Sequence, residues 1–401
     1  MEILFLSRLI PSEFKEEVTA KMIHTMDNAS IALQEKLVTG FDINLGHPVH
    51  VLNYLPIFSF PEGYKDPFVK TSFFSHAEGS WDVNLGFCNV KYIKRLLQGG
   101  SMRKYLNEWM KTNNGCERAA VAYTPYPEFL EAFRQIKQLD PTVHTCVIVP
   151  DLPQYLGLGA SKRGSVYRRY NEMNFQKNMQ YVDSFVLLTE AMAEALHVNE
   201  KPYIVMEGIA SLDFPSVEPA TKNSEIFTVF YGGTLHKAFG IELLLNAVEK
   251  ISDQSIRFQL CGIGDTEERI KEMAKRDQRI EYLGQLSREE VLMRMQMADV
   301  IINPRPGTEE FTKYSFPSKN LEALSSGVPF IGFKLAGIPN EYDEYINYPK
   351  SQNAEGLAEM IMQVKHDLPE YQQKAKAAKQ YVEENKAAVA QCGRIISMLQ
   401  R

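Results

Sequence analysis

The chain has 401 residues, of which 44% are hydrophobic and 23% charged, with 44 basic residues against 50 acidic ones. This length is too great for one ordinary core and suits two domains of about 150 to 220 residues each. The composition is that of a globular protein, and the acidic excess excludes a general attraction for nucleic acid. Any anionic ligand must therefore be held by local groups.

The cysteines and the first residues indicate the compartment. Five cysteines without a CxxC pair argue against a disulfide framework and a structural zinc site. Cys146 and Cys261 lie inside apolar runs, so we expect buried, reduced thiols and a cytoplasmic protein. The apolar run in MEILFLSRLIPSEF is too short for a signal peptide, and no stretch reaches the roughly 18 to 20 apolar residues of a membrane span.

The first 210 residues alternate short apolar strands with amphipathic helices, which is typical of a parallel sheet covered on both faces. Residues 56–80, rich in Pro, Phe, Gly and Ser, are expected to form an irregular loop. The expected strands are 1–6, 49–55, 81–87, 119–123, 143–149, 185–189 and 203–206, and the expected helices are 13–37, 91–110, 128–138 and 190–196.

Asp151 follows the predicted strand 143–149. Ligands of parallel sheets bind at the carboxyl ends of the strands, so Asp151 is placed toward the ligand-binding edge of the first domain. An ordinary loop aspartate is the alternative interpretation.

A basic segment, 159–180, interleaves positive and aromatic side chains. A solvated helix face is the favoured interpretation. The alternative is a surface that contacts anionic lipid or a lipid-diphosphate acceptor, at the inner face of the membrane. Its basic and aromatic residues are Lys162, Arg163, Tyr167, Arg168, Arg169, Tyr170, Phe175 and Lys177.

Residues 211–224, SLDFPSVEPATKNS, form the clearest break in composition and are predicted to be a linker. Beyond it the alternation restarts, which predicts a second doubly wound domain over 225–380 after a first over 1–210. The last segment, 381–401, is expected to be a helix that packs back on the first domain. The strands expected in the second domain are 227–231, 256–261, 280–283, 300–303 and 328–331, and the helices are 240–251, 266–275, 288–297, 354–366 and 368–384.

Glycines follow the first two strands of the second domain. In Tyr231-Gly232-Gly233-Thr234 they allow close approach of a ligand, and the helix that follows favours negative charge. A plain strand-to-helix turn is the alternative. Lys237 lies in the same loop and could meet a phosphate. The GxG at Gly262 fails as a dinucleotide fingerprint, yet Gly262 is expected to line the same crevice.

The stretch 303–332 carries a second group of polar residues. Arg305, Ser318 and Lys319 offer a guanidinium, a hydroxyl and an ammonium close to one helix start, which can bind two phosphates without a metal. Ser318 could equally be a helix N-cap. Glu322, one turn further on, can accept hydrogen bonds from a ribose, with a solvent-facing acid as the alternative.

Several catalytic motifs are absent from the sequence. It contains no Asp-x-Asp metal motif, no GxxxxGK[ST] phosphate loop, no HExxH and no GxSxG. Metal-dependent sugar transfer, P-loop chemistry and serine hydrolysis therefore lose support. We expect neither a bound metal nor a cofactor.

Taken together, the second-domain motifs resemble those of the GT-B glycosyltransferases, specifically glycosyltransferase family 4, which has the glycosyl transferases group 1 domain. The resemblance covers about residues 225–365 and is architectural over the first 200. It implies an α/β fold of two Rossmann-like domains facing each other across a cleft, the first binding the acceptor and the second the nucleotide sugar. The motifs are GGT, GxG, YLGQLS, ADVIINP and SFPSKNLEALSSGVPFIG.

The resemblance also implies roles for single residues. Glu322 matches the second acid of the family's E-x7-E motif and would bind the ribose, whereas the place of the first acid is occupied by Tyr314. Glu310, nearby but out of register, is assigned the catalytic role of that first acid. Asp151 occupies the strand end where many relatives carry a His or Asp near the reacting sugar.

In the phosphate loop, the usual Arg and Lys of the family are replaced by Thr234 and Phe239. Lys319, Arg305 or Lys237 is expected to supply the positive charge instead. The nucleotide-sugar-binding set is therefore Gly233, Thr234, Lys237, Gly262, Arg305, Ser318, Lys319 and Glu322.

The implied activity is transfer of a sugar from a UDP- or GDP-sugar to a glycan or lipid-linked glycan acceptor, in polysaccharide or glycoconjugate biosynthesis. Members of the family usually retain the anomeric configuration and use neither metal nor cofactor. Two alternatives stay open. One is epimerisation of a UDP-sugar on the same fold, and the other is a non-catalytic GT-B subunit that binds nucleotide sugar or a partner enzyme.

Overall fold

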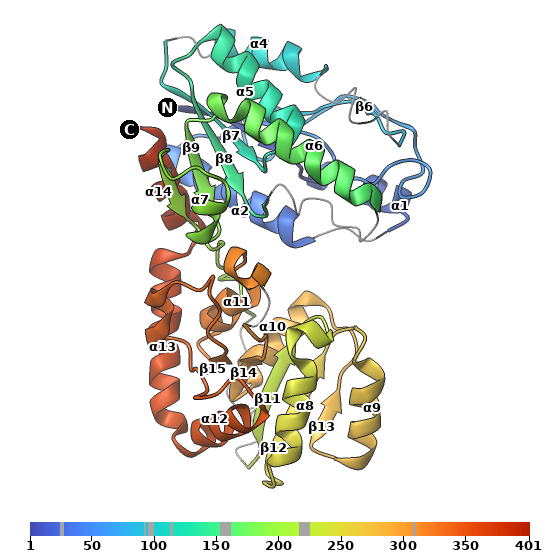
Figure 1. Ribbon diagram of the computed structural model, residues 1–401. Coiled ribbons are helices and arrows are strands. Elements are labelled where there is room, and N and C mark those ends of the chain that lie inside the picture. The colour runs from blue at the N-terminus through green and yellow to red at the C-terminus, as the bar shows by residue number, and fades with distance from the viewer. Residues whose placement is uncertain are drawn as a thin grey trace. The chain divides into compact units, whose positions relative to one another are not determined.

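The computed structural model describes residues 1–24, 28–91, 94, 100–112, 115–152, 162–215, 225–307 and 310–401. The chain forms two compact units (Figure 1). The first unit comprises Met1–Ile209 together with Ala388–Arg401, and the second comprises Ala210–Ala387. Most of the predicted linker lies outside the described residues.

The first unit is built on an eight-stranded sheet in the order β10-β9-β8-β7-β1-β2-β5-β4. All its strand pairs are parallel except β4 with β5. A separate antiparallel pair joins β3 and β6. The strands are β1 (Glu2–Ser7), β2 (His50–Asn53), β3 (Phe68–Val69), β4 (Ser72–Phe74), β5 (Asp82–Asn84), β6 (Phe87–Cys88), β7 (Arg118–Tyr123), β8 (His144–Val149), β9 (Ser184–Leu187) and β10 (Tyr203–Val205).

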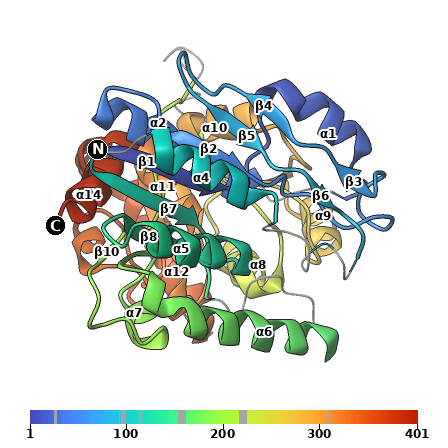
Figure 2. The ribbon, with the colours of Figure 1, turned by 90° about the horizontal axis from the view of Figure 1, so that it is seen from above.

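Helices cover both faces of this sheet, which explains the nearly continuous apolar runs of β1, β7 and β8. Figure 2 shows α2 (Asn28–Leu45) and α14 (Ala388–Leu399) on one side, with α5 (Pro127–Leu139) and α6 (Lys162–Asn178) on the other. The α14 helix packs on α2, where the Cys392 thiol donates to the Leu37 carbonyl at 3.4 Å and Asn44 Nδ2 donates to the Val389 carbonyl at 2.9 Å. The remaining α-helices described in the first unit are α1 (Lys15–Lys21), α4 (Met102–Thr112) and α7 (Ala191–Ala195).

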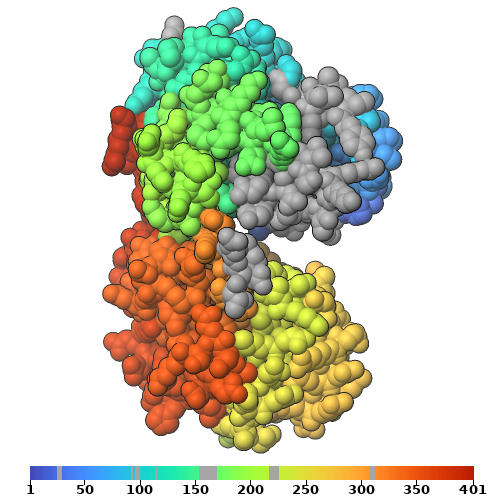
Figure 3. All heavy atoms as spheres, viewed as in Figure 1, coloured from blue at the N-terminus to red at the C-terminus, as the bar shows by residue number. Residues whose placement is uncertain are grey.

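The second unit has a five-stranded, wholly parallel sheet in the order β13-β12-β11-β14-β15. One face packs on α8, α9 and α12 and the other on α10, α11 and α13. Figure 3 shows α8 beside the segment that contains α12 on one surface of the unit. The elements are β11 (Phe227–Gly232), α8 (Ile241–Lys250), β12 (Ile256–Cys261), α9 (Glu267–Arg276), β13 (Ile280–Tyr282), α10 (Arg288–Met297), β14 (Val300–Asn303), α11 (Ser318–Ser326), β15 (Phe330–Gly332), α12 (Ala354–His366) and α13 (Leu368–Asn385).

The strand orders give each sheet a topological switch point, where the chain reverses its direction of travel across the sheet. In the first unit the chain leaves β1 toward β2 and later returns to β7 on the other side of β1. In the second unit it leaves β11 toward β12 and β13 and returns to β14. Open parallel sheets bind ligands at the carboxyl ends of the two strands that flank this point.

Two predictions about the first unit are wrong. The expected single helix 13–37 is broken: α1 ends at Lys21, and Met22 is extended, with φ −74° and ψ 144°. Met22 forms a bridge with Tyr64, so a distant pairing interrupts the helical pattern. The segment 56–80, expected to be an irregular loop, contains β3 and β4. The β4 strand pairs with β5, where Phe73 lies opposite Val83.

Other predicted features agree with the structure. Cys146 and Cys261 are buried, at 0% and 1% exposure. Helices lie at 354–366 and across 368–384, as the periodicity predicts. Across the described ranges, every helix is too short or too polar to traverse a lipid bilayer.

Candidate functional site

The switch point of the second unit lies between the carboxyl ends of β11 and β14. The loop after β11 and the segment after β14 meet there, since the guanidinium carbon of Arg305 lies 5.4 Å from the ring centroid of Phe239. We call this place the β11/β14 crevice and define it by Tyr231, Gly233, Gly262, Arg305 and Lys319. It is the position at which this topology predicts a ligand.

Two glycines bring backbone segments together in the crevice. Gly233 has φ +156° and donates its N–H to the Cys261 carbonyl at 2.9 Å. Gly262 has φ +132° and donates to the Gly284 carbonyl at 2.8 Å. A Cβ atom on Gly262 would overlap the carbonyl oxygen of Gly233. Only glycine fits at this contact.

Lys319 is the second residue of α11, and its side chain occupies the space left by the missing side chain of Gly233. A Cβ atom on Gly233 would overlap the ammonium of Lys319. The same ammonium lies 5.3 Å from the ring centroid of Tyr231. Asn303 Nδ2 donates to Asn320 Oδ1 at 2.8 Å, which ties the start of α11 to the end of β14. The position of Lys319 is therefore fixed from both sides.

The ammonium of Lys319 makes no hydrogen bond or ion pair with any residue that the structure describes. Burial lowers its pKa, the charge of Arg305 lowers it further, and Glu322 opposes both effects. Burial also lowers the pKa of Arg305, whose guanidinium donates to Ser315 Oγ at 3.3 Å. Because two desolvated cations share the crevice, a bound anion would stabilise both of them.

The nearest titratable groups do not supply that anion. Burial raises the pKa of the Cys261 thiol to about 11, so this thiol is neutral near pH 7. Burial also raises the pKa of Tyr231, whose hydroxyl donates to the Thr234 carbonyl at 2.8 Å. The Glu322 carboxylate does act on Lys319, but it is paired with Arg288, so a bound anion would add negative charge next to Lys319.

Glu322 lies one helical turn after Lys319, with its side chain 25% exposed. Its Oε1 is 2.9 Å from a guanidinium nitrogen of Arg288 on α10. Arg288 also donates to Ser211 Oγ at 2.9 Å. This arrangement holds one oxygen of the carboxylate and leaves Oε2 to accept a hydroxyl.

Three other predicted residues lie at the surface around the crevice. Lys237 is exposed, with Nζ 3.5 Å from Glu242 Oε1 of α8, so its charge is directed toward an acid rather than toward Lys319. Thr234 is exposed on the loop after β11. Ser318 is the exposed first residue of α11, whose N-cap is Pro317.

Of the two predicted catalytic residues, the structure describes the side chain of Asp151 but not that of Glu310. Asp151 lies just beyond β8 in the first unit and is exposed, at the carboxyl edge of that sheet. Glu310 begins the short 3-10 helix Glu310–Tyr314, and its side chain lies outside the described residues. In the basic segment, the side chains of 162–168 are likewise outside the described part, while Arg169 and Tyr170 are exposed.

Sequence reasoning did not identify three contributors to the site. Tyr231 provides the ring beneath Lys319, and its place directly before the paired glycines was an available signal. Arg288 and Asn303 reach Glu322 and Asn320 only through the fold, so no local pattern could predict them. Within the described ranges, no group of three or more His, Cys, Asp or Glu residues is arranged to hold a metal ion.

Comparisons with known proteins relate the second unit to one family and the whole chain to one fold. Residues 226–367 match the family described as Glycosyl transferases group 1. No curated protein sequence matches the chain. Solved structures do match over its full length, at identities that show the fold alone.

Three of these structures represent the similarity. Sucrose-phosphate synthase from Thermosynechococcus elongatus is 16% identical with a TM-score of 0.62, covering 100% of this chain and 99% of that one. Anabaena Alr3699/HepE, solved with UDP, is 13% identical with a TM-score of 0.61 and complete coverage of both chains. A glycosyltransferase from Rickettsia africae ESF-5 is 13% identical with a TM-score of 0.62, covering 100% of this chain and 98% of its own.

The predicted fold class, α/β with parallel sheets of the GT-B type, is thus confirmed. The matched family segment contains the whole β11/β14 crevice together with Glu322. Residues 226–367 of the second unit thus resemble the glycosyl transferases group 1 family, and the chain has the GT-B fold.

Proposed function

We propose that the β11/β14 crevice binds the diphosphate of a UDP- or GDP-sugar and that the enzyme transfers the sugar to a glycan or lipid-linked glycan acceptor, as a member of glycosyltransferase family 4. The proposal rests mainly on the position of the Lys319 side chain, which packs against Gly233 and lies near Arg305. Within the described chain, no carboxylate is bonded to the Lys319 ammonium. A diphosphate would bring negative charge to the desolvated Lys319 ammonium beside Arg305.

Two structural neighbours support the choice of ligand. Anabaena Alr3699/HepE was solved with UDP, and the pneumococcal O-GlcNAc transferase GtfA, 11% identical with a TM-score of 0.56, was solved with UDP and GlcNAc. In our proposal Glu322 accepts hydrogen bonds from the ribose through the oxygen that Arg288 does not hold. Gly233 and Gly262 allow the phosphates to approach the backbone.

The proposed reaction breaks the bond between the anomeric carbon and the diphosphate as an acceptor oxygen bonds to that carbon. Negative charge then builds up on the departing diphosphate, where Lys319 and Arg305 stabilise it. We assign Asp151 to orienting the acceptor or the sugar and Glu310 to the catalytic role of the first acid of the family's E-x7-E motif. Transfer proceeds with retention of configuration and without a metal ion or cofactor.

The proposed setting is polysaccharide or glycoconjugate biosynthesis in the cytoplasm. A lipid-linked acceptor would bring the enzyme to the inner face of the membrane, where the basic segment 159–180 could contact anionic lipid. Exposed Arg169 supports this contact. Vesicles with and without anionic lipid, compared in a sedimentation assay, test this part separately.

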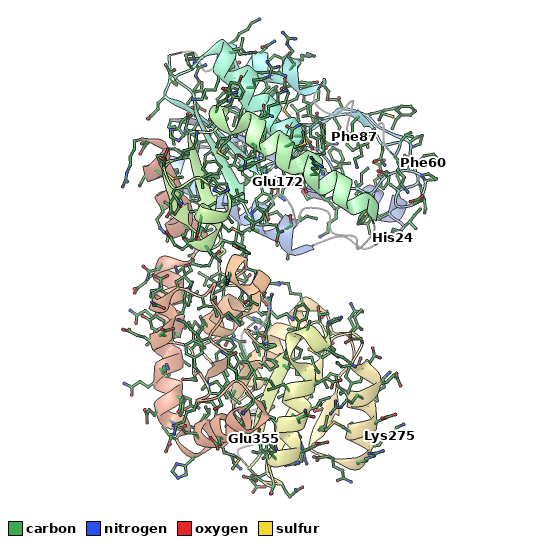
Figure 4. All side chains as sticks on the ribbon, in the orientation of Figure 1. His24, Phe60, Phe87, Glu172, Lys275 and Glu355 are labelled. Atoms are coloured by element: carbon green, nitrogen blue, oxygen red, sulfur yellow. The ribbon has the colours of Figure 1, made fainter. Side chains whose placement is uncertain are left out.

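Calorimetric titration with UDP and GDP tests the donor site. Lys319→Ala should weaken binding of the preferred nucleotide by about 10- to 100-fold, the cost of one or two hydrogen bonds to a charged group. Lys275→Ala is the matched control, since Lys275 is an exposed lysine on α9 of the same unit (Figure 4). Equal nucleotide affinity in the two variants would overturn the assignment of the crevice.

Activity measurements separate an enzyme from a binding subunit. The wild type should hydrolyse its nucleotide sugar slowly in the presence of a metal chelator, and Asp151→Ala should lower transfer while nucleotide affinity is kept. Donor turnover that disappears on chelation contradicts metal independence. Nucleotide binding without any donor turnover would instead favour the non-catalytic subunit.

A further inference from the structure

A cavity in the second unit shares no lining residue with the β11/β14 crevice. Its volume is about 400 Å³, within the roughly 300 to 1,000 Å³ typical of small-molecule sites. Its walls come from the segment 347–350 and from facing sides of α12 and α13. We call it the α12/α13 cavity.

A buried acceptor without a donor lines this cavity. Asn347 is only 4% exposed, and its main chain is held by hydrogen bonds to Phe330 and Gly332 of β15. Its Nδ2 donates to the Phe330 carbonyl at 2.9 Å, whereas its Oδ1 has no hydrogen-bond partner among the described residues. A buried amide oxygen without a donor is unfavourable, and a ligand hydroxyl that donates to it would offset this cost.

A donor lines the same cavity. Lys374 of α13 donates to the Ile346 carbonyl at 3.1 Å and forms no ion pair within the described chain. Burial is the main reason why its pKa is lowered. Its two remaining N–H groups are available to a ligand oxygen.

The charges around the cavity indicate a neutral ligand. Lys350 and Lys374 are balanced by Glu359 and Glu370, so neither an anion nor a cation is favoured. Tyr371 and Met360 add aromatic and apolar surface next to these polar groups. A sugar ring matches this combination, because it presents C–H faces to apolar side chains and hydroxyls to donors and acceptors.

We propose that the α12/α13 cavity binds a neutral carbohydrate, with one hydroxyl donating to Asn347 Oδ1 and another hydroxyl oxygen accepting from Lys374. The site is separate from the donor crevice and lies on the same unit. It gives the glycosyltransferase a second contact with sugar that takes no part in the transfer step.

Methionine methyl groups report on this site directly. Met360 lines the cavity at 8% exposure, whereas Met362 of the same helix is 37% exposed and does not line it. In protein labelled at its methionine methyl groups, titration with glucose, galactose or N-acetylglucosamine should shift the Met360 resonance saturably for at least one sugar. The Met362 resonance should stay unchanged.

A pair of substitutions locates the binding. Gln363→Trp, at an exposed lining position, should obstruct the cavity and weaken the sugar about tenfold or more, the equivalent of about 1.4 kcal/mol. Met362→Trp adds the same side chain beside the cavity and should leave the affinity unchanged. Equal affinity in the two variants, or no saturable shift with any of the three sugars, would overturn the proposal.

Two further arms test the class and the independence of the site. Glucose 6-phosphate should bind more weakly than the preferred neutral sugar, and exclusive binding of the phosphate would show that the class is wrong. Lys319→Ala should leave the Met360 titration unchanged, so failure of the donor assignment is distinguishable from failure of this one. Loss of the sugar-induced shift in Lys319→Ala would show that the sugar occupies the donor crevice instead.

Discussion

The switch points of the two units share a topology and differ in how they treat positive charge. In the first unit, Arg8 follows β1, forms an ion pair with Glu128, and lies 3.8 Å over the ring centroid of Tyr126. In the second unit, Lys319 has an aromatic ring beneath it and no bonded carboxylate among the described residues.

The charge of Arg8 is neutralised within the protein and stabilises the fold. We propose that the charge of Lys319 is neutralised by a bound ligand instead. A charge balanced inside the protein contributes to stability, whereas a desolvated charge without a counter-ion lowers stability until an anion binds. The positive charge at the first switch point is thus balanced within the protein, whereas our proposal places an anion beside the second. Four measurements test this contrast.

The largest effect should follow from Arg8→Ala. The side chains of Arg8 and Glu128 are 19% and 8% exposed, so the substitution leaves a largely buried carboxylate without its cation. The free energy of unfolding should fall by about 3 to 5 kcal/mol in urea titrations. A double variant, Arg8→Leu with Glu128→Leu, should recover most of that loss. If Arg8→Ala is no less stable than the wild type, Arg8 is not the structural cation we describe.

The next effect concerns His76, another charge balanced within the first unit. Its Nδ1 lies 2.7 Å from Asp82 Oδ2 and its Nε2 lies 3.0 Å from Asp42 Oδ2. Burial lowers the pKa of His76, but the two carboxylates raise it more, to about 9. The rise from 6.5 corresponds to about 3 kcal/mol.

That stabilisation should be fully present below pH 6.5, the unfolded-state pKa, and should disappear as the pH rises through about 9. Unfolding measured across this range should show the alkaline loss in the wild type and not in His76→Gln. A His76→Gln variant with the same pH dependence as the wild type would assign the titration to another group.

Gly233→Ala should act on Lys319, the cation that we propose binds the nucleotide. The new methyl group would displace the Lys319 ammonium, so nucleotide affinity should fall about tenfold. Gly284→Ala is the control, because Gly284 also has a positive φ, +67°, but no neighbouring atom within 4 Å of its added Cβ. It carries the backbone strain without the displacement, and an equal loss of affinity in both variants would attribute the effect to strain alone.

The smallest effect is on the stability of the ligand-free protein. Lys319→Met removes a desolvated charge and should raise the free energy of unfolding by about 1 kcal/mol near pH 7 while weakening nucleotide binding by about 10- to 100-fold. Since the native pKa of Lys319 is below that of the unfolded chain, stability should rise with pH between the lowered pKa and 10.5, opposite in sign to His76. The variant should lack this rise. A less stable variant would mean that Lys319 is structural.

The fold class could be predicted because parallel strands that are buried on both faces have nearly continuous apolar sequences. The runs at Ala119–Tyr123 and His144–Val149 correspond to β7 and β8, which are buried on both faces. The break near Met22 could not be predicted, because the residue that pairs with it, Tyr64, is distant in the chain. Local periodicity shows which face of a helix is buried, but it does not show where a distant residue pairs with the chain and ends the helix.

Only part of the candidate site could be predicted from the sequence. Glycines at Gly233 and Gly262 mark close backbone contacts, and α11 begins at Ser318, one position from where the N-cap interpretation of Ser318 would start it. The contact between the Lys319 side chain and Gly233 depends on how β11 and α11 pack. The ion pair between Arg288 and Glu322 depends on how α10 and α11 pack. The roles of Asp151 and Glu310 stay predictions.

The return of α14 to the first unit constrains the order in which the protein can fold during synthesis. Strands β1 to β10 leave the ribosome before residues 210–387, yet the apolar face of α2 is covered by α14, which is made afterwards. At about 5 to 20 residues per second, the first unit waits roughly ten to forty seconds for its last helix. The second unit is completed only at the end of that interval, just before α14 is made, so a nascent chain should expose the α2 surface to chaperones while residues 210–387 are synthesised.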